Sequence, residues 1–120
     1  MNIEQLREYC LKKKGVTEDF PFDEHTLVFK VLGKMFALVG LEKWEIGHRS
    51  INLKCDPDYA EQLRAEYDSI NPGYHMSKKH WNTVDLASGE IPPKFLMELI
   101  DHSYDMVVKN MPKKMQNTLL

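Results

Sequence analysis

Hydrophobic residues recur at the spacing of a helical face in three stretches of this 120-residue chain. The first covers residues 2–14, and the second runs from Asp56 to about Tyr67. The third begins at Pro92-Pro93, continues to about Asn110 and has the most continuous apolar stripe. The pattern therefore predicts three helices. The expected core stripe of the last one consists of Leu96, Leu99, Ile100, Ser103 and Val107, flanked by Phe95 and Val108.

Other stretches alternate apolar and polar residues, which is the pattern of a strand with one buried face. Residues 26–40 hold two apolar runs around Gly33-Lys34, and a two-residue loop that begins with glycine predicts a hairpin with a type II′ turn. Residues 49–55 alternate cleanly, and residues 80–86 also have strand propensity. Residues 74–77 are a candidate for a short arm that pairs with the 80–86 strand.

The remaining segments have the composition of turns and loops. Residues 17–24 (TEDFPFDE) hold four acids and a proline, so they are interpreted as a connecting loop. Residues 41–48 show no regular pattern, and Asn71-Pro72-Gly73 is typical of a turn. We expect a single domain over residues 1–112, followed by a flexible tail at residues 113–120.

The predicted order is helix, three strands, helix, two strands, helix (α-β-β-β-α-β-β-α). A hairpin-led antiparallel sheet with its helices on one face gives an α+β fold, with about five strands. A chain of this length buries roughly two-thirds of its unfolded surface on folding. The core is therefore large enough to need neither a metal nor a disulfide for stability.

Charge and composition narrow the functional classes. The net charge is −2 and apolar residues make up 42% of the chain, so any binding of nucleic acid or anionic membrane must come from a local patch. No run approaches the ~20 apolar residues of a membrane span, and the N-terminus lacks the long apolar run of a signal peptide. We expect a cytoplasmic protein of bacterial type.

No residue pattern points to a catalytic or cofactor site. Cys10 and Cys55 belong to no C-x-x-C pair, and His75 and His80 match no common zinc spacing. Glycine-rich phosphate-binding motifs are absent, and Ser103 lacks the context of a nucleophile. We expect Ser103 to let the helix approach the sheet, with its hydroxyl bonded to a carbonyl one turn back. The sequence predicts no enzyme, metal or cofactor.

One stretch, NPGYHMSKKHWNTV at residues 71–84, contains no acid although the chain as a whole is acidic. Adjacent lysines are usually solvated surface when they stand alone. Here they accompany histidines and aromatic rings, and lysines bind phosphates while aromatic faces stack on bases. Trp81 is expected to face the helices and to anchor this wing from behind. The candidate binding residues are Tyr74, His75, Lys78, Lys79 and His80.

The same stretch resembles the MmcQ/YjbR family. The most specific match is the series Pro-Gly-Tyr-His-Met, Lys, His-Trp-Asn from Pro72 to Asn82. The segments "GKMFALV", "INLKCDPDYAEQLR" and "LIDHSYDMV" extend the resemblance over about residues 1–110. It implies a CyaY-like (double-wing) α+β fold and a DNA-binding function, and it implies no catalytic residues.

Two functions remain open at this point. The first is binding of DNA or another polyanion through the wing at residues 71–84. The alternative is a protein–protein interaction or adaptor domain that uses the same surface on an acidic partner. We expect a monomer in either case.

Overall fold

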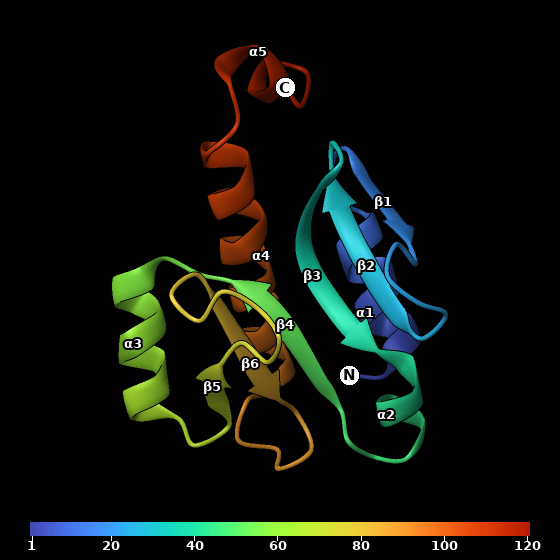
Figure 1. Cartoon of the computed structure of the whole chain (residues 1–120), viewed down its shortest axis with the longest axis vertical. Helices are drawn as coiled ribbons and strands as arrows, with labels where there is room; N and C mark the ends of the chain where they lie inside the picture. Colours follow the sequence, from blue (N-terminus) through green and yellow to red (C-terminus); the bar gives the residue numbers. More distant parts are fainter.

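Six strands form one antiparallel sheet in the computed structural model, which describes residues 1–120 (Figure 1). The strand order is β1-β2-β3-β4-β6-β5, and every neighbouring pair is antiparallel. The predicted α+β class and antiparallel sheet are confirmed, with one strand more than expected. The elements are α1 (Ile3–Leu11), β1 (Val16–Asp19), β2 (Thr26–Val31), β3 (Lys34–Gly40), α2 (Leu41–Glu45), β4 (Ser50–Lys54), α3 (Pro57–Glu66), β5 (Ile70–Pro72), β6 (Trp81–Asp85), α4 (Pro93–Lys109) and α5 (Lys113–Asn117).

The main core lies between the sheet and the helices on one of its faces. Helix α4 packs against β2, β3 and β4, α1 packs against β1, and α3 packs against β5. The opposite face of the sheet has no helix packed across its centre (Figure 1). The predicted stripe of α4 is confirmed, since Leu96, Leu99, Ile100, Ser103 and Val107 are all buried.

The acidic segment predicted as a loop contains the edge strand β1. Glu18 faces α1, where Arg7 Nε donates a hydrogen bond of 2.9 Å to its carboxylate. Asp19 faces the other side and lies 3.3 Å from Lys30 Nζ on β2. The negative charges of Glu18 and Asp19 are therefore balanced by Arg7 and Lys30 on the neighbouring elements. Charged side chains on an edge strand also discourage pairing with another chain.

The β2–β3 hairpin is confirmed, but its turn lies one residue earlier than predicted. Leu32 (φ +48°) and Gly33 (φ +84°) both have positive φ, which defines a type I′ turn rather than the type II′ turn expected at Gly33-Lys34. The pairing shifts between Phe29 and Lys30. Their partners are Ala37 and Met35, so Phe36 is the extra residue of a β-bulge.

Two further segments differ from the sequence-based expectation. Residues 41–48 were expected to be irregular but contain α2, in which Trp44 is buried. The indole N–H of Trp44 donates a hydrogen bond to Ser50 O at 2.9 Å. The expected flexible tail at residues 113–120 contains α5, whose Met115 and the following Leu119 pack against the core. Both helices are too short to show a clear apolar period in the sequence.

The sheet has a narrow junction between its two three-stranded halves. Strands β3 and β4 pair only at Ala37 with Leu53 and at Leu38 with Asn52. Next to these pairs, the side chain of Ser103 on α4 links β3 to β4 in place of a direct backbone hydrogen bond between the two strands. Its hydroxyl donates to Phe36 O at 2.5 Å and accepts from Lys54 N at 2.9 Å. The hydroxyl therefore bridges two strands, and the expected bond to a carbonyl of its own helix is wrong.

His102, beside Ser103, is a partly buried histidine whose lowered pKa predicts a pH-dependent contribution to stability. Its Nε2 accepts a hydrogen bond of 3.1 Å from the backbone N–H of Asp56, the N-cap of α3. Burial lowers the pKa of His102, although the carboxylates of Asp56 and Asp105 oppose this shift. In the unfolded chain the imidazole regains its ordinary pKa of about 6.5 and takes up a proton first. This group's stabilising contribution is therefore present above about pH 6.5 and is lost as the pH falls toward the lowered folded pKa.

We therefore expect the thermal midpoint of the protein to fall between pH 7 and pH 5 by more than that of a His102→Gln variant. Glutamine offers a carbonyl oxygen to the same N–H and does not titrate. Calorimetry of both proteins at several pH values measures the difference. Identical pH dependence of the two midpoints would contradict the role assigned to His102.

Candidate functional site

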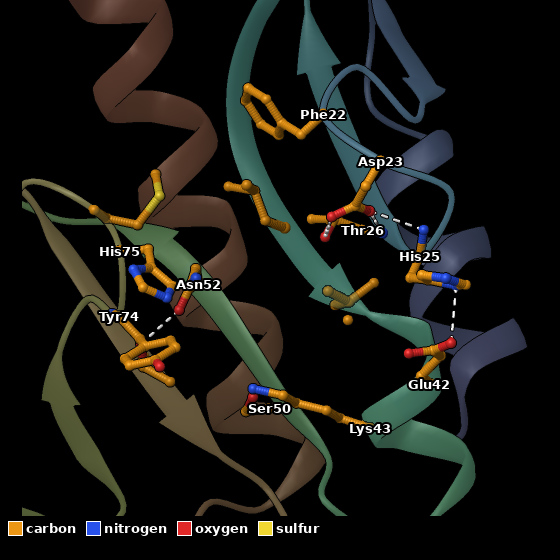
Figure 2. A pocket seen from close by; sticks show the side chains of 15 residues that line it. Phe22, Asp23, His25, Thr26, Glu42, Lys43, Ser50, Asn52, Tyr74 and His75 are labelled. Atoms are coloured by element: carbon orange, nitrogen blue, oxygen red, sulfur yellow. Dashed lines mark hydrogen bonds and ion pairs between the residues drawn. The ribbon is translucent and has the colours of Figure 1, made fainter.

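A groove lies on the helix-free face of the sheet, between the loop that precedes β2 and the loop that joins β5 to β6. We call it the open-face groove, and its volume is about 730 Å³. Asn52 of β4 and Thr83 of β6 are among the strand residues that line it, and Figure 2 shows Asn52 next to His75. Phe22, Asp23, His25, Thr26, Glu42 and Lys43 line one side, and Tyr74, His75 and Met76 line the other.

A small hydrophobic cluster lies on this same face of the sheet. It consists of Val28, Leu38 and Trp81, with Met35 and Met76 packed against it. Trp81 is buried, as the sequence predicts, with 8% of its surface exposed. Its position differs from the expectation, because the ring faces away from the helices. The alternation of residues along the strand correctly predicted that Trp81 and Thr83 share one face. It could not show which of the two faces the helices cover.

The loop from Gly73 to His80 is folded back onto the sheet. Gly73 N donates to Trp81 O at 2.8 Å, and Tyr74 N donates to the Thr83 hydroxyl at 3.0 Å. Gly73 is needed here, because a Cβ at this position would lie 2.8 Å from that of Trp81. The expected turn at residues 71–73 is therefore wrong, since residues 70–72 form β5. Residues 74–77 form no pairing arm with β6.

Tyr74 and His75 form the side of the groove that this loop provides. Their ring centroids are 4.0 Å apart, and 62% of the Tyr74 surface is exposed. His75 adopts a positive φ of +59°, which costs a non-glycine residue energy and is common at binding sites. Lys43 of α2 places its Nζ 5.3 Å from the Tyr74 ring centroid, a cation–π contact across the groove.

The opposite side of the groove carries negative charge. The Asp23 carboxylate accepts hydrogen bonds from the backbone N–H groups of His25 and Thr26, and these bonds lower its pKa. His25 Nδ1 lies 3.2 Å from the Glu42 carboxylate, as the dashed lines in Figure 2 show. The exposed ring of Phe22 comes from the same loop as Asp23 and points away from these residues (Figure 2). The groove therefore has an acidic side with an aromatic ring and an opposite side with no acid.

The five candidate residues from the sequence separate into two groups. Tyr74 and His75 line the groove, whereas Lys78, Lys79 and His80 are exposed and do not. Arg64 of α3 holds the second group in place by donating to Lys78 O and, at 3.1 Å, to Trp81 O. Its Nε also donates to Asn82 Oδ1 at 2.7 Å. The lysines therefore extend from a fixed backbone at one end of the loop.

Two strand residues that line the groove, Asn52 and Thr83, were not among the candidates from sequence. Asn52 and Thr83 are opposite each other in register, and the Thr83 hydroxyl donates to Asn52 Oδ1 at 2.5 Å. The only side-chain hydrogen bond of Asn52 uses its Oδ1, so its side-chain N–H groups are available to a ligand. Alternation did place Asn52 outside the core. Its position beside Thr83 depends on the pairing of two strands that are far apart in sequence.

The structure shows no arrangement typical of metal or thiol chemistry. No three His, Cys, Asp or Glu side chains lie close enough to hold a metal ion. Both cysteines are buried and free, and burial raises the pKa of Cys10 to about 12 and that of Cys55 to about 11. Both therefore remain protonated thiols at neutral pH. None of the helices has the length and apolar character required to cross a membrane.

Comparison with known proteins identifies clear relatives. The family model described as YjbR matches residues 11–106. The uncharacterized protein YjbR of Escherichia coli K12 is 32% identical over 121 residues, covering 100% of this chain and 98% of the relative. The uncharacterized protein YbdF of Escherichia coli O157:H7 is 40% identical, covering 94% of this chain and 89% of the relative.

Two crystal structures resemble the whole fold. Protein DR2400 of Deinococcus radiodurans has a TM-score of 0.88 and 40% identity, covering 98% of this chain and 87% of that one. A protein from Pseudomonas syringae has a TM-score of 0.73 and 32% identity, covering 88% of this chain and 98% of that one. None of these names states an activity or a ligand.

Proposed function

The chain belongs to the YjbR family, and we propose that it is a non-enzymatic domain that binds nucleic acid across the helix-free face of its sheet. The observation that supports this most strongly is the open-face groove with Tyr74 and Phe22 exposed on its two sides. Exposed aromatic rings stack on unpaired bases, and each base stacked in this way contributes about 1–3 kcal/mol. The groove thus offers stacking surfaces that a helix-covered sheet face lacks.

The charges around the groove favour one orientation of a bound strand. Asp23 and Glu42 lie on the Phe22 side and repel phosphates. Lys43, Lys54, Lys78 and Lys79 form no ion pair with another side chain, and Lys54 is the register partner of Trp81, next to the loop. The phosphate backbone is therefore expected to follow the 73–80 loop, with the bases turned toward the groove.

This arrangement favours single-stranded over double-stranded nucleic acid. Bases in a duplex are stacked on one another and cannot reach an aromatic side chain. In a single strand they are free to stack on Tyr74 and to accept a hydrogen bond from the side-chain amide of Asn52. A duplex could contact only the lysines, through its phosphates.

Replacing both Lys78 and Lys79 with alanine tests the phosphate contact. Binding to every sequence should weaken, and the slope of log K against log salt should become shallower by up to about 1.4, since each phosphate neutralised on a single strand adds roughly 0.7 to the slope. The thermal midpoint should not change, because both side chains are exposed. The measurement is fluorescence anisotropy with labelled single-stranded and duplex DNA and RNA at several salt concentrations.

A matched control is the Lys34→Ala/Lys94→Ala double variant, which removes two exposed lysines outside the groove and the 73–80 loop. It should bind as the unmodified protein does. The proposal fails if the unmodified protein does not bind at low salt, or if the Lys78/Lys79 variant keeps its affinity and slope. Absence of binding at low salt would favour the adaptor function, with the same surface contacting an acidic protein partner.

A further inference from the structure

A second basic surface lies where the ends of α1 and α4 meet α5. No acidic residue occurs from Met106 to Leu120, and this segment contains three lysines. A hollow of about 580 Å³ opens here, lined by Lys13, Lys14 and Lys113 together with uncharged side chains. We call Lys14, Lys109, Lys113 and Lys114 the lysine corner. In Figure 1 it lies at the α5 end of the long axis, far from the β5–β6 loop.

Contacts between the three helices fix the lysine corner in place. The Tyr104 hydroxyl of α4 donates to Lys14 O at 2.6 Å, just beyond the end of α1. In the segment that contains α5, Gln116 donates to Met111 O at 2.8 Å. Leu119 packs on Gly15 so closely that a Cβ there would come within 2.6 Å of its side chain. The backbone that carries the lysines is therefore ordered before any partner binds.

The charges of the lysine corner are not neutralised within the protein. Lys13 differs from its neighbours, since its Nζ is paired with Asp101 at 2.5 Å and contacts the rings of Tyr9 and Tyr104. The four lysines of the corner form no ion pair, and all four are exposed. They add positive charge in one corner of a protein whose net charge is −2.

Helix stabilisation explains only part of this cluster. Cations at the last turn of a helix interact favourably with its dipole, which accounts for Lys109 and for lysines that follow α1. Lys113 is instead the first residue of α5, where the dipole does not favour a cation, whereas Lys114 also belongs to the last turn of this five-residue helix. The helix dipole therefore does not account for Lys113.

We propose that the lysine corner is a second contact for nucleic acid, which binds the phosphate backbone without reading bases. The class of ligand rests on the proposed function, whereas the surface is separate from the open-face groove and shares no residue with it. Lysines bind phosphate as point charges without the geometric demands of a bidentate contact, and no aromatic face is fully exposed here for stacking. Binding at this corner is therefore expected to be independent of sequence and sensitive to salt.

The test compares two double variants, each with two lysines replaced by glutamine. Lys14→Gln/Lys113→Gln removes the unpaired charges that line the hollow, and Lys34→Gln/Lys94→Gln is the control with the same change in net charge. Anisotropy titrations with a long duplex and a long single strand are performed over a range of salt concentrations. The first variant should show a shallower salt slope on duplex, by up to about 1.8 at roughly 0.9 for each neutralised phosphate, and the control should match the unmodified protein.

The outcomes separate this proposal from the preceding one. If the corner variant keeps the slope of the unmodified protein while the Lys78/Lys79 variant does not, the corner proposal is overturned and the groove proposal stands. If only the corner variant changes, the corner proposal is supported and the groove proposal fails. If the unmodified protein binds no nucleic acid, both are overturned.

Discussion

Trp81→Ala is expected to lower the free energy of unfolding by about 3–5 kcal/mol, the range for removing a large aromatic side chain from a buried site. The ring is 8% exposed and packs with Val28 and Leu38 on the helix-free face. No helix covers this face, so little else can close the resulting cavity. The loss is measured from urea unfolding followed by far-UV circular dichroism.

The Trp81→Phe variant provides the control, since it keeps an aromatic ring in the same place. It should retain most of the stability that Trp81→Ala loses. The alanine variant should also bind nucleic acid poorly, because the Trp81 backbone and side chain support the loop that carries Tyr74. A loss in stability smaller than about 0.5 kcal/mol, the usual size of a surface effect, would show that the cluster contributes little.

Ile100→Ala is expected to cost about 2–5 kcal/mol. Ile100 is completely buried at the centre of the α4 stripe. Alanine is the better helix former, so the loss must come from packing rather than from the helix itself. Equilibrium unfolding in urea gives the difference between the variant and the unmodified protein.

Ile100→Val removes only one methylene and should cost about 0.5–1.5 kcal/mol. The two variants together test whether stability follows the volume removed. If Ile100→Ala unfolds with the same midpoint as the unmodified protein, the stripe is not the packed core that the structure shows.

Periodicity predicted well those elements whose pattern repeats several times. The sequence correctly predicted helix α4 with its buried stripe, and it correctly predicted the alternation of β4. The strand β1 was missed because its acids, Glu18 and Asp19, find cationic partners on other elements. Such partners are set by tertiary contacts, which a local pattern does not contain.

The candidate site was predicted only where its residues are consecutive. Tyr74 and His75 were identified because they lie in an acid-free stretch. Phe22, Asn52 and Lys43 come from three other segments, and only the strand order brings them to the same groove. The prediction that Lys78 and Lys79 contact phosphate stays a prediction, now with a defined position at one end of the loop.

The narrow junction between β3 and β4 has a consequence for ligand affinity. One side of the open-face groove belongs to the β1-β2-β3 half of the sheet, and the other side belongs to the β4-β6-β5 half. The junction has only two paired positions, so we expect it to be the place where the angle between the halves changes most easily. A change in that angle would alter the distance between Phe22 and Tyr74. A ligand that fits one angle better than others selects that angle, and its affinity includes the energy of holding it there. Ser103 bonds to both halves from the helix side of the sheet, so we expect it to influence affinity without touching the ligand.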